Sequence, residues 1–449
     1  MRALVLVFVF LCTVLAPAAA TAQDPATLRR EIEQLQKQLQ SVTERLQRLE
    51  AQPPAPAPAP VAAPGAPGVA APPPPSAIDL ARPRQPYSLY QQRGSGQLLF
   101  DIGIAGDFVG NITQFNVQKA QGGTFSGQEN RFFPREIELA LLGQIDPYAS
   151  AVVRFEAGQS GRDPETNVSL AEANFTLLAL PYGTQAKFGQ MRNRFGYTNE
   201  IHEHDLPWVD RPNVMRYFLG DEGLVENGVE LTLVPDLPFY VQALFGVFNG
   251  DNGTAFGAGT LRQPLYTGRL RTFFELGLEH GLQLGMSVAA GPTTESFPNT
   301  ILGWEGRYKY RPDGWLHPLL TVTGEALYSL REFNVQTDTD GDGLIDSIRK
   351  VEKDRFGWYV GAEVQPSRRW AGGFRYDSTQ YPQNPGYEWA IEPYVTFWPS
   401  EFLRFRLAWK HTDRTSRDGW NNNGGSARQV DEVLFQGSFI LGAHPAHPF

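Results

Sequence analysis

The sequence predicts an all-β fold: a transmembrane antiparallel β-barrel of about 16 strands, preceded by a short α-helical coiled coil and a Pro/Ala-rich linker. Three observations favour this fold. Apolar and polar residues alternate with a period of two from about Leu98 onwards. The alternating segments are roughly 10 residues long, which is the length of a membrane-spanning strand. Short turns alternate along the chain with long polar loops, as they do in transmembrane barrels.

Composition excludes several other classes of protein. The net charge of −9 gives no reason to expect nucleic acid as a partner. The single cysteine, Cys12, lies in the leader, so the mature chain has no disulfide, no thiol catalysis and no cysteine-based zinc site. No apolar run as long as a transmembrane helix follows the first residues of the chain.

Residues 1–22 read as a signal peptide. Arg2 supplies the basic start, an apolar run extends from Leu4 to Leu15, and Ala20-Thr21-Ala22 forms a small-residue cleavage site. The alternative is an N-terminal membrane anchor, but the apolar run is short for that role. The sequence thus predicts export of the mature protein.

Residues 23–52 form a heptad segment, and residues 53–97 form the Pro/Ala-rich linker. The apolar residues follow the 4,3 spacing of a coiled-coil seam: Leu28, Ile32, Leu35, Leu39, Val42, Leu46 and Leu49. So short a seam predicts an oligomer in which a larger domain concentrates the helices. A monomeric amphipathic helix is the alternative. The linker reads as a semi-rigid polyproline-type spacer before the barrel of residues 98–449.

The stretch LRFRLAWK (Leu403–Lys410) shows the barrel pattern most clearly. Its apolar residues point one way and its basic residues, Arg404, Arg406 and Lys410, point the other. Charge recurs on the second face of many such segments, which predicts a polar lumen. Aromatic residues near the segment ends would form the girdles at the two membrane interfaces, and the chain ends in Phe449.

One loop concentrates charged and aromatic residues. The strand pattern of AKFGQMRNRFG (Ala186–Gly196) gives way to a long polar excursion over Tyr197–Gly228. A long, ordered loop rich in charge is where function is expected. Its titratable residues include His202, Glu203, His204, Asp205, Asp210, Arg211 and Arg216.

Two segments carry a resemblance to a known family: RFFPREIELALLGQIDPYASAVVRFEAG (Arg131–Gly158) and AKFGQMRNRFGYTNE (Ala186–Glu200). They resemble the second-to-fifth strand region of Gram-negative outer-membrane porins of the phosphate-selective O/P type, and the resemblance covers roughly residues 98–449. It implies a homotrimer in the outer membrane of a Gram-negative bacterium, embedded in lipid and lipopolysaccharide. It also implies that the third extracellular loop, here Tyr197–Gly228, folds into the lumen as a constriction.

A constriction needs charged side chains that face water and replace part of an ion's hydration. The residues expected there are Arg192, Arg194, Glu203, Asp205, Asp210, Arg211, Arg216, Arg269, Arg271, Arg404 and Arg406. The alternative is a loop that only braces the barrel wall through salt bridges. Glu136, Glu138, Glu156 and Glu363 lie on comparable faces, so the sign of ion selectivity stays open.

Two motifs are candidate metal sites, although the sequence predicts no required cofactor. Asp338, Asp340, Asp342 and Asp346 match the early positions of a Ca²⁺-binding loop, but the twelfth position is Arg349 rather than glutamate. The alternative is a solvated acidic hairpin loop. His202 and His204 offer a weaker candidate zinc pair, and ordinary polar loop histidines are the preferred interpretation.

The predicted function is passive diffusion of small hydrophilic solutes or ions through a water-filled barrel. No serine-triad elbow, phosphate-binding loop or dinucleotide fingerprint is present, so we expect no enzyme. The alternatives are a zinc-related uptake protein, and an envelope tether whose coiled coil contacts peptidoglycan. The sequence leaves the solute, the ion preference and the pore radius undetermined.

Overall fold

The structure, a computed structural model, describes residues 100–114, 124–125, 127–159, 166–337, 347–383, 385–414 and 428–442. The signal peptide, the coiled coil, the linker, the candidate calcium loop of residues 338–346 and Phe449 lie outside these ranges. What the sequence predicts for these segments therefore stays a prediction.

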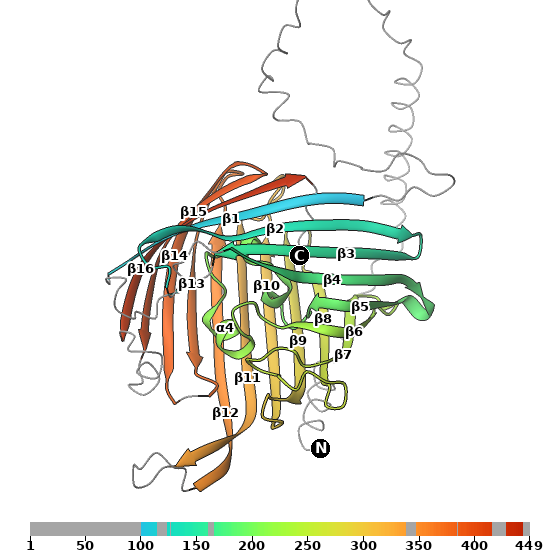
Figure 1. The fold of residues 1–449 in the computed structure, drawn as a ribbon. Helices are drawn as coiled ribbons and strands as arrows, with labels where there is room; N and C mark the ends of the chain where they lie inside the picture. The colour runs from blue at the N-terminus through green and yellow to red at the C-terminus, as the bar shows by residue number, and fades with distance from the viewer. Residues whose placement is uncertain are drawn as a thin grey trace, which may run out of the picture. The chain divides into compact units, whose positions relative to one another are not determined.

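Sixteen strands in the described ranges form one closed antiparallel barrel (Figure 1). Each strand pairs with its neighbours in sequence, and β1 pairs with β16 to close the barrel. The prediction of an antiparallel barrel of about 16 strands is confirmed. The strands are β1 (Phe100–Thr113), β2 (Arg131–Asp146), β3 (Ala149–Gln159), β4 (Thr166–Leu180), β5 (Thr184–Arg192), β6 (Val225–Leu233), β7 (Tyr240–Phe248), β8 (Leu265–Glu275), β9 (His280–Pro292), β10 (Pro298–Tyr310), β11 (Leu320–Thr337), β12 (Ser347–Val364), β13 (Trp370–Gln380), β14 (Tyr387–Ser400), β15 (Leu403–Arg414) and β16 (Gln429–Gly442).

The barrel is apolar outside and polar inside, as the alternation predicts. On β15, Leu407 and Trp409 are 50% and 44% exposed, whereas Arg406 and Lys410, which flank this pair, are buried. This distribution suits a wall with hydrocarbon outside and a polar lumen inside. Among the described residues, no helix is both long and apolar enough to cross a membrane.

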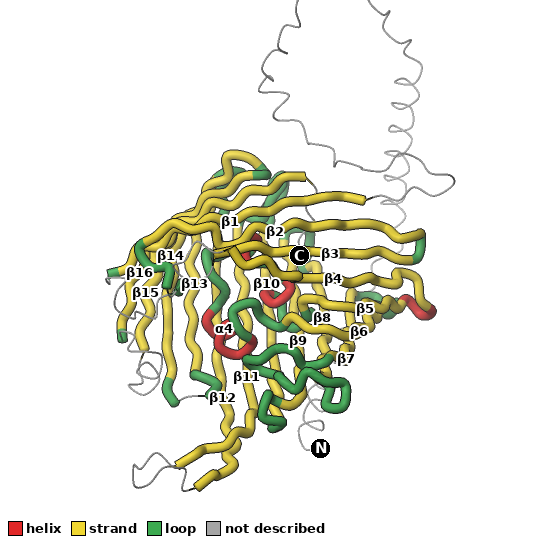
Figure 2. The backbone as a smooth tube through the Cα atoms, in the orientation of Figure 1, coloured by secondary structure: helices red, strands yellow, loops and turns green. Residues whose placement is uncertain are grey.

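The segment between β5 and β6, residues 193–224, is the main non-strand element in the described part of the barrel (Figure 2). We call it the β5–β6 loop. It contains two 3₁₀ turns, η2 (Thr198–Glu200) and η3 (Glu203–Asp205), and one short helix, α4 (Asn213–Leu219). It ends earlier than the sequence predicted, because β6 begins at Val225, which pairs with Arg192 on β5.

The β5–β6 loop supplies much of the buried apolar core. Trp208, Val214 and Phe218 from the loop are buried together with Phe248 of β7 and Tyr359 of β12. Helix α4 contacts β11, β12 and β13, which lie far from β5 and β6 around the barrel. The lumen is thus crossed by a packed segment, and this segment positions the candidate site.

Candidate pore constriction

The first anchor of the β5–β6 loop is the carboxylate of Glu325 on β11. It accepts hydrogen bonds from the backbone N–H groups of Tyr197 and Thr198, both at 2.9 Å. The hydroxyl of Tyr359 on β12 donates to the same carboxylate at 2.6 Å. A carboxylate at the start of a helical turn satisfies backbone donors that otherwise have no partner. The start of η2 is thereby fixed to strands across the lumen.

The second anchor is a buried ion network around Asp210. Its carboxylate lies 2.7 Å from the Arg375 guanidinium on β13 and 2.5 Å from Lys410 Nζ on β15. Burial alone would raise the pKa of Asp210, but Arg375 and Lys410 hold that pKa well below its ordinary value. The carboxylate therefore stays ionised and paired, and the middle of the loop is held against β13 and β15.

An apolar contact reinforces the second anchor. Trp208 is 2% exposed and meets the Tyr359 ring edge to face, with ring centroids 5.2 Å apart. The Arg375 guanidinium carbon lies 5.2 Å from the centre of the same indole, a cation–π distance. A Cβ at Gly361 on β12 would lie 2.6 Å from the indole, so the close approach of loop and wall requires glycine there.

Wall arginines bind the loop through its backbone carbonyls. Arg406 on β15 donates to the Leu206 carbonyl at 3.1 Å, and Arg404 donates to the His204 carbonyl. On β2, Arg135 donates to the Glu203 carbonyl at 3.1 Å and to the Val209 carbonyl. These three guanidinium groups therefore connect the barrel wall to the backbone of the loop.

Four other arginines that were expected at the constriction contact carboxylates or carbonyls of the loop and of nearby strands. Arg192 donates to the Glu222 carbonyl at 2.5 Å, and Arg194 lies 2.5 Å from Glu230. Arg269 pairs with Glu305 at 2.6 Å and also with Glu200, which lies 3.6 Å from Arg271. Arg194, Arg269 and Arg271 therefore lie on one side of the loop, whereas Arg192 also lies 3.9 Å from Glu156 on β3, on the side of the cavity.

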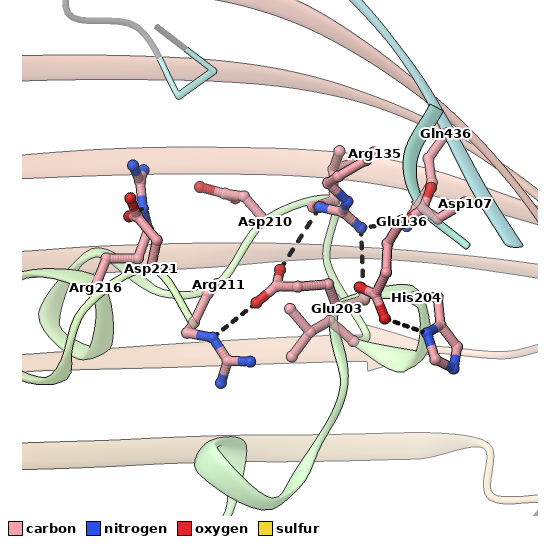
Figure 3. Close-up of polar contacts among 12 residues, drawn as sticks. Asp107, Arg135, Glu136, Glu203, His204, Asp210, Arg211, Arg216, Asp221 and Gln436 are labelled. Atoms are coloured by element: carbon pink, nitrogen blue, oxygen red, sulfur yellow. Dashed lines mark hydrogen bonds and ion pairs between the residues drawn. The ribbon is translucent and has the colours of Figure 1, made fainter. Parts of the chain in front are cut away.

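A cavity of about 430 Å³ lies on the other side of the loop, toward β2, β3 and β4. The predicted residues Glu203, Asp210, Arg211 and Arg216 line it. Figure 3 shows Glu203 between Arg135 and Arg211, at 3.7 Å and 2.8 Å from their guanidinium nitrogens. The predicted set did not contain these charged lining residues: Arg135, Glu136, Glu156, Asp221 and Glu222.

The missed residues had a partial signal in the sequence. Asp221 and Glu222 belong to the same charged loop, and Glu136 and Glu156 share the lumen-facing register of their strands. Asp221 and Glu222 have well exposed side chains, whereas Arg216, the partner of Asp221 at 3.0 Å, is mostly buried. These two carboxylates are therefore the lining charges most open to the cavity.

The two loop histidines face different carboxylates. His202 contacts Glu138, Glu156 and Glu172 on the wall. His204 Nδ1 lies 2.9 Å from Glu136, and its Nε2 lies 3.1 Å from Asp205. Burial would lower the pKa of each imidazole, but the hydrogen bonds that the imidazoles donate to carboxylates raise both pKa values above the ordinary range. The predicted zinc pair thus has two separate sets of neighbours.

No protein-family model matches the sequence. The chain is 29% identical over 349 residues to an uncharacterized protein of Aquifex aeolicus strain VF5, a match that spans 70% of this chain and 69% of that protein.

Two solved structures match the fold across most of the chain. One is the outer membrane channel DcaP of Acinetobacter baumannii, with a TM-score of 0.51 and 11% identity over 80% of this chain and all of that one. The other is the anion-selective porin from Comamonas acidovorans, with a TM-score of 0.50 and 10% identity over 77% of this chain and 99% of that one. The chain therefore has the 16-stranded barrel fold of outer-membrane porins.

Proposed function

We propose that this protein is a porin of a Gram-negative outer membrane, through which small hydrophilic solutes or ions diffuse passively. One observation carries the proposal. The β5–β6 loop crosses the lumen and is bonded to strands on the far side, including β11, β13 and β15. A barrel that served only as a membrane anchor would not need an internal segment with so many specific contacts. A loop fixed in the lumen narrows a water path without closing it.

The lining of the cavity supports the same function. Charged groups from β2, β3 and the loop surround a space of about 430 Å³, large enough for several water molecules. Charges of both signs lie within a few ångströms of one another there, as between Glu203 and Arg211. Such a lining suits hydrated polar solutes. The channel and porin named in the comparisons have the same fold, which is consistent with this role.

Conductance of the purified barrel in a planar lipid bilayer tests the proposal. We expect discrete, voltage-independent conductance steps that scale with salt concentration. A barrel that inserts but stays electrically silent would contradict the proposal.

A cysteine variant tests the position of the water path. The sequence contains a single cysteine, in the predicted leader, so Asp221→Cys would introduce a unique thiol at the cavity. A bulky methanethiosulfonate should reduce the conductance of Asp221→Cys. The matched control is Leu278→Cys, at an almost fully exposed position in the β8–β9 turn. Equal effects at both positions would remove the cavity from the path.

The homotrimer and the peptidoglycan contact belong to the same proposal, and the resemblance to phosphate-selective porins makes phosphate an ion to test. Each has its own test: competition by phosphate for ion current, chemical cross-linking in native membranes, and loss of envelope attachment on deletion of residues 24–76.

A further inference from the structure

His202 brings the β5–β6 loop against three adjacent wall strands. Its Nδ1 lies 3.0 Å from Glu138 on β2 and 3.2 Å from Glu156 on β3. Its Nε2 lies 2.9 Å from Glu172 on β4. His202 and Glu138 are buried, at 5% and 1% exposure. One imidazole therefore touches three carboxylates, each from a different strand.

The wall itself places like charges together. Glu138 and Glu156 are direct partners across the β2–β3 ladder. Like charges directly opposite each other destabilise a sheet. The nearby guanidiniums compensate only in part: Arg154 lies 3.0 Å from Glu138, and Arg192 lies 3.9 Å from Glu156. A further positive charge between β2 and β3 would stabilise these two facing carboxylates.

The hydrogen-bond inventory of His202 locates that charge. A carboxylate only accepts, so Nε2 must donate its proton to Glu172. Its Nδ1 atom faces the carboxylate oxygens of Glu138 and Glu156, so either a proton or a metal ion must lie between them. Three acceptors facing one another are stable only around a cation. Glu138, Glu156 and Glu172 carry three negative charges against the guanidiniums of Arg154 and Arg192, and Glu136 adds a fourth beside His204.

We propose that Glu138, Glu156 and the Nδ1 atom of His202, together with Glu136, bind a divalent transition-metal ion of the zinc type. One potential ligand atom from each of the four residues lies within 4.8 Å of the others. Imidazole with carboxylates is a donor set for zinc-type ions, whereas Mg²⁺ and Ca²⁺ prefer oxygen alone. Ligands around a tetrahedral Zn²⁺ lie about 3.3 Å apart, close to the 3.0 and 3.2 Å from Nδ1 to its two carboxylates.

Two surrounding features fit such a site. Glu172 would orient the imidazole by accepting from Nε2, the arrangement in which metal-binding histidines are usually held. Glu136 and Glu156 also line the 430 Å³ cavity, so an ion reaches the site without opening the barrel. A bound ion would join β2, β3 and the loop. The inference concerns a binding site and does not rest on the proposed diffusion of solutes.

Metal titration of the barrel in detergent tests the site, after removal of metal with a chelator. We expect one equivalent of Zn²⁺ by calorimetry, and one equivalent of Co²⁺ with the visible absorption of tetrahedral coordination. His202→Gln and Glu138→Gln should each abolish saturable binding. Glu172→Gln should weaken it by about tenfold, because that residue only orients the imidazole.

Control variants separate this site from other histidines. His204→Gln changes only a neighbour of Glu136, so it should lower affinity far less than His202→Gln does, which excludes a site built on the two loop histidines. His411→Gln should also keep it, although His411 lies 2.8 Å from Asp431 in another histidine–carboxylate pair. Each variant is first checked for the heat-modifiable gel mobility of a folded barrel, and Glu156→Gln replaces any that fails.

Unchanged affinity in His202→Gln, or no saturable binding in the wild type, would overturn the proposal and leave a proton alone as the cation. Conductance measured in the presence of chelator tests the proposed pore without bound metal. The experiments therefore distinguish a failure of the metal-site proposal from a failure of the porin proposal.

Discussion

The two sides of the β5–β6 loop are built differently. Toward β11 to β15, the loop packs Trp208 and α4 against the wall and buries ion pairs around Asp210. Toward β2, β3 and β4, the loop is joined to the wall at His202 and Arg135 and leaves a cavity of about 430 Å³ lined by charged groups. The first side resembles the core of a globular protein, and the cavity on the second side resembles a solvated surface. The comparison teaches that one face is filled by packed side chains, while the other leaves part of its area to water and solutes.

Buried charge has a different role on each side. Asp210, Arg375 and Lys410 pair at 2.5 to 2.7 Å with almost no exposure, so they fix a position. Asp221 and Glu222 keep their carboxylates exposed to the cavity, so they set its potential. Substitutions on the first side should therefore change stability, and substitutions on the second should change ion preference.

Trp208→Ala should have the largest effect. Removal of a buried indole leaves a cavity beside Tyr359 and Gly361, and such changes cost about 3–5 kcal/mol of unfolding free energy. Urea unfolding followed by far-ultraviolet circular dichroism measures the loss. Leu316→Ala, at a well exposed position, is the control and should stay within about 0.5 kcal/mol. A loss below about 1 kcal/mol in Trp208→Ala would show that this side of the loop is not packed as a core.

Asp210→Asn should have the next largest effect. It leaves Arg375 and Lys410 buried without their shared carboxylate, and breaking one partner of a buried pair costs about 3 kcal/mol. The loosened loop should also add current noise in the open channel. Asp221→Asn is the matched control, because its carboxylate is mostly exposed. Equal stability of the two variants would contradict the anchoring role.

Asp210 should also make the free energy of unfolding depend on pH in the acid range. The pKa of Asp210 is held below its ordinary value of 3.8, so its contribution to stability is complete above that value and is lost as pH falls below it. The difference in unfolding free energy between wild type and Asp210→Asn should thus be constant from neutral pH to about pH 5 and shrink below about pH 4. Urea unfolding at each pH measures it. A difference that persists unchanged at pH 3 would assign the stabilisation to another group.

The sequence predicted the wall better than the lumen. A period of two is visible in single strands, so β15 and its neighbours could be placed from alternation alone. A charged side chain that points into the lumen can either face water or bond to the loop. Which of the two it does depends on partners that are far away in the sequence. Arg406 was expected at the pore, yet it donates to the carbonyl of Leu206. Every residue has a backbone carbonyl, so the sequence does not indicate which one accepts such a bond. The loop itself was found because its composition departs from the strand pattern.

The smallest expected effect tests the solvated side. Glu222→Gln combined with Asp221→Asn removes two carboxylates that face the cavity, and urea unfolding should be almost unchanged because both side chains are well exposed. The reversal potential across a salt gradient should shift toward anion preference, whatever the sign of the wild type. Salt ions screen these charges, because the Debye length is about 10 Å at 0.1 M salt and about 3 Å at 1 M. The shift should therefore be larger in dilute salt, and the matched pair Asp236→Asn and Glu279→Gln, in turns outside the cavity lining, should give none. An identical shift in the control pair would mean that the whole barrel's charge, rather than the face left open by the loop, sets the ion preference.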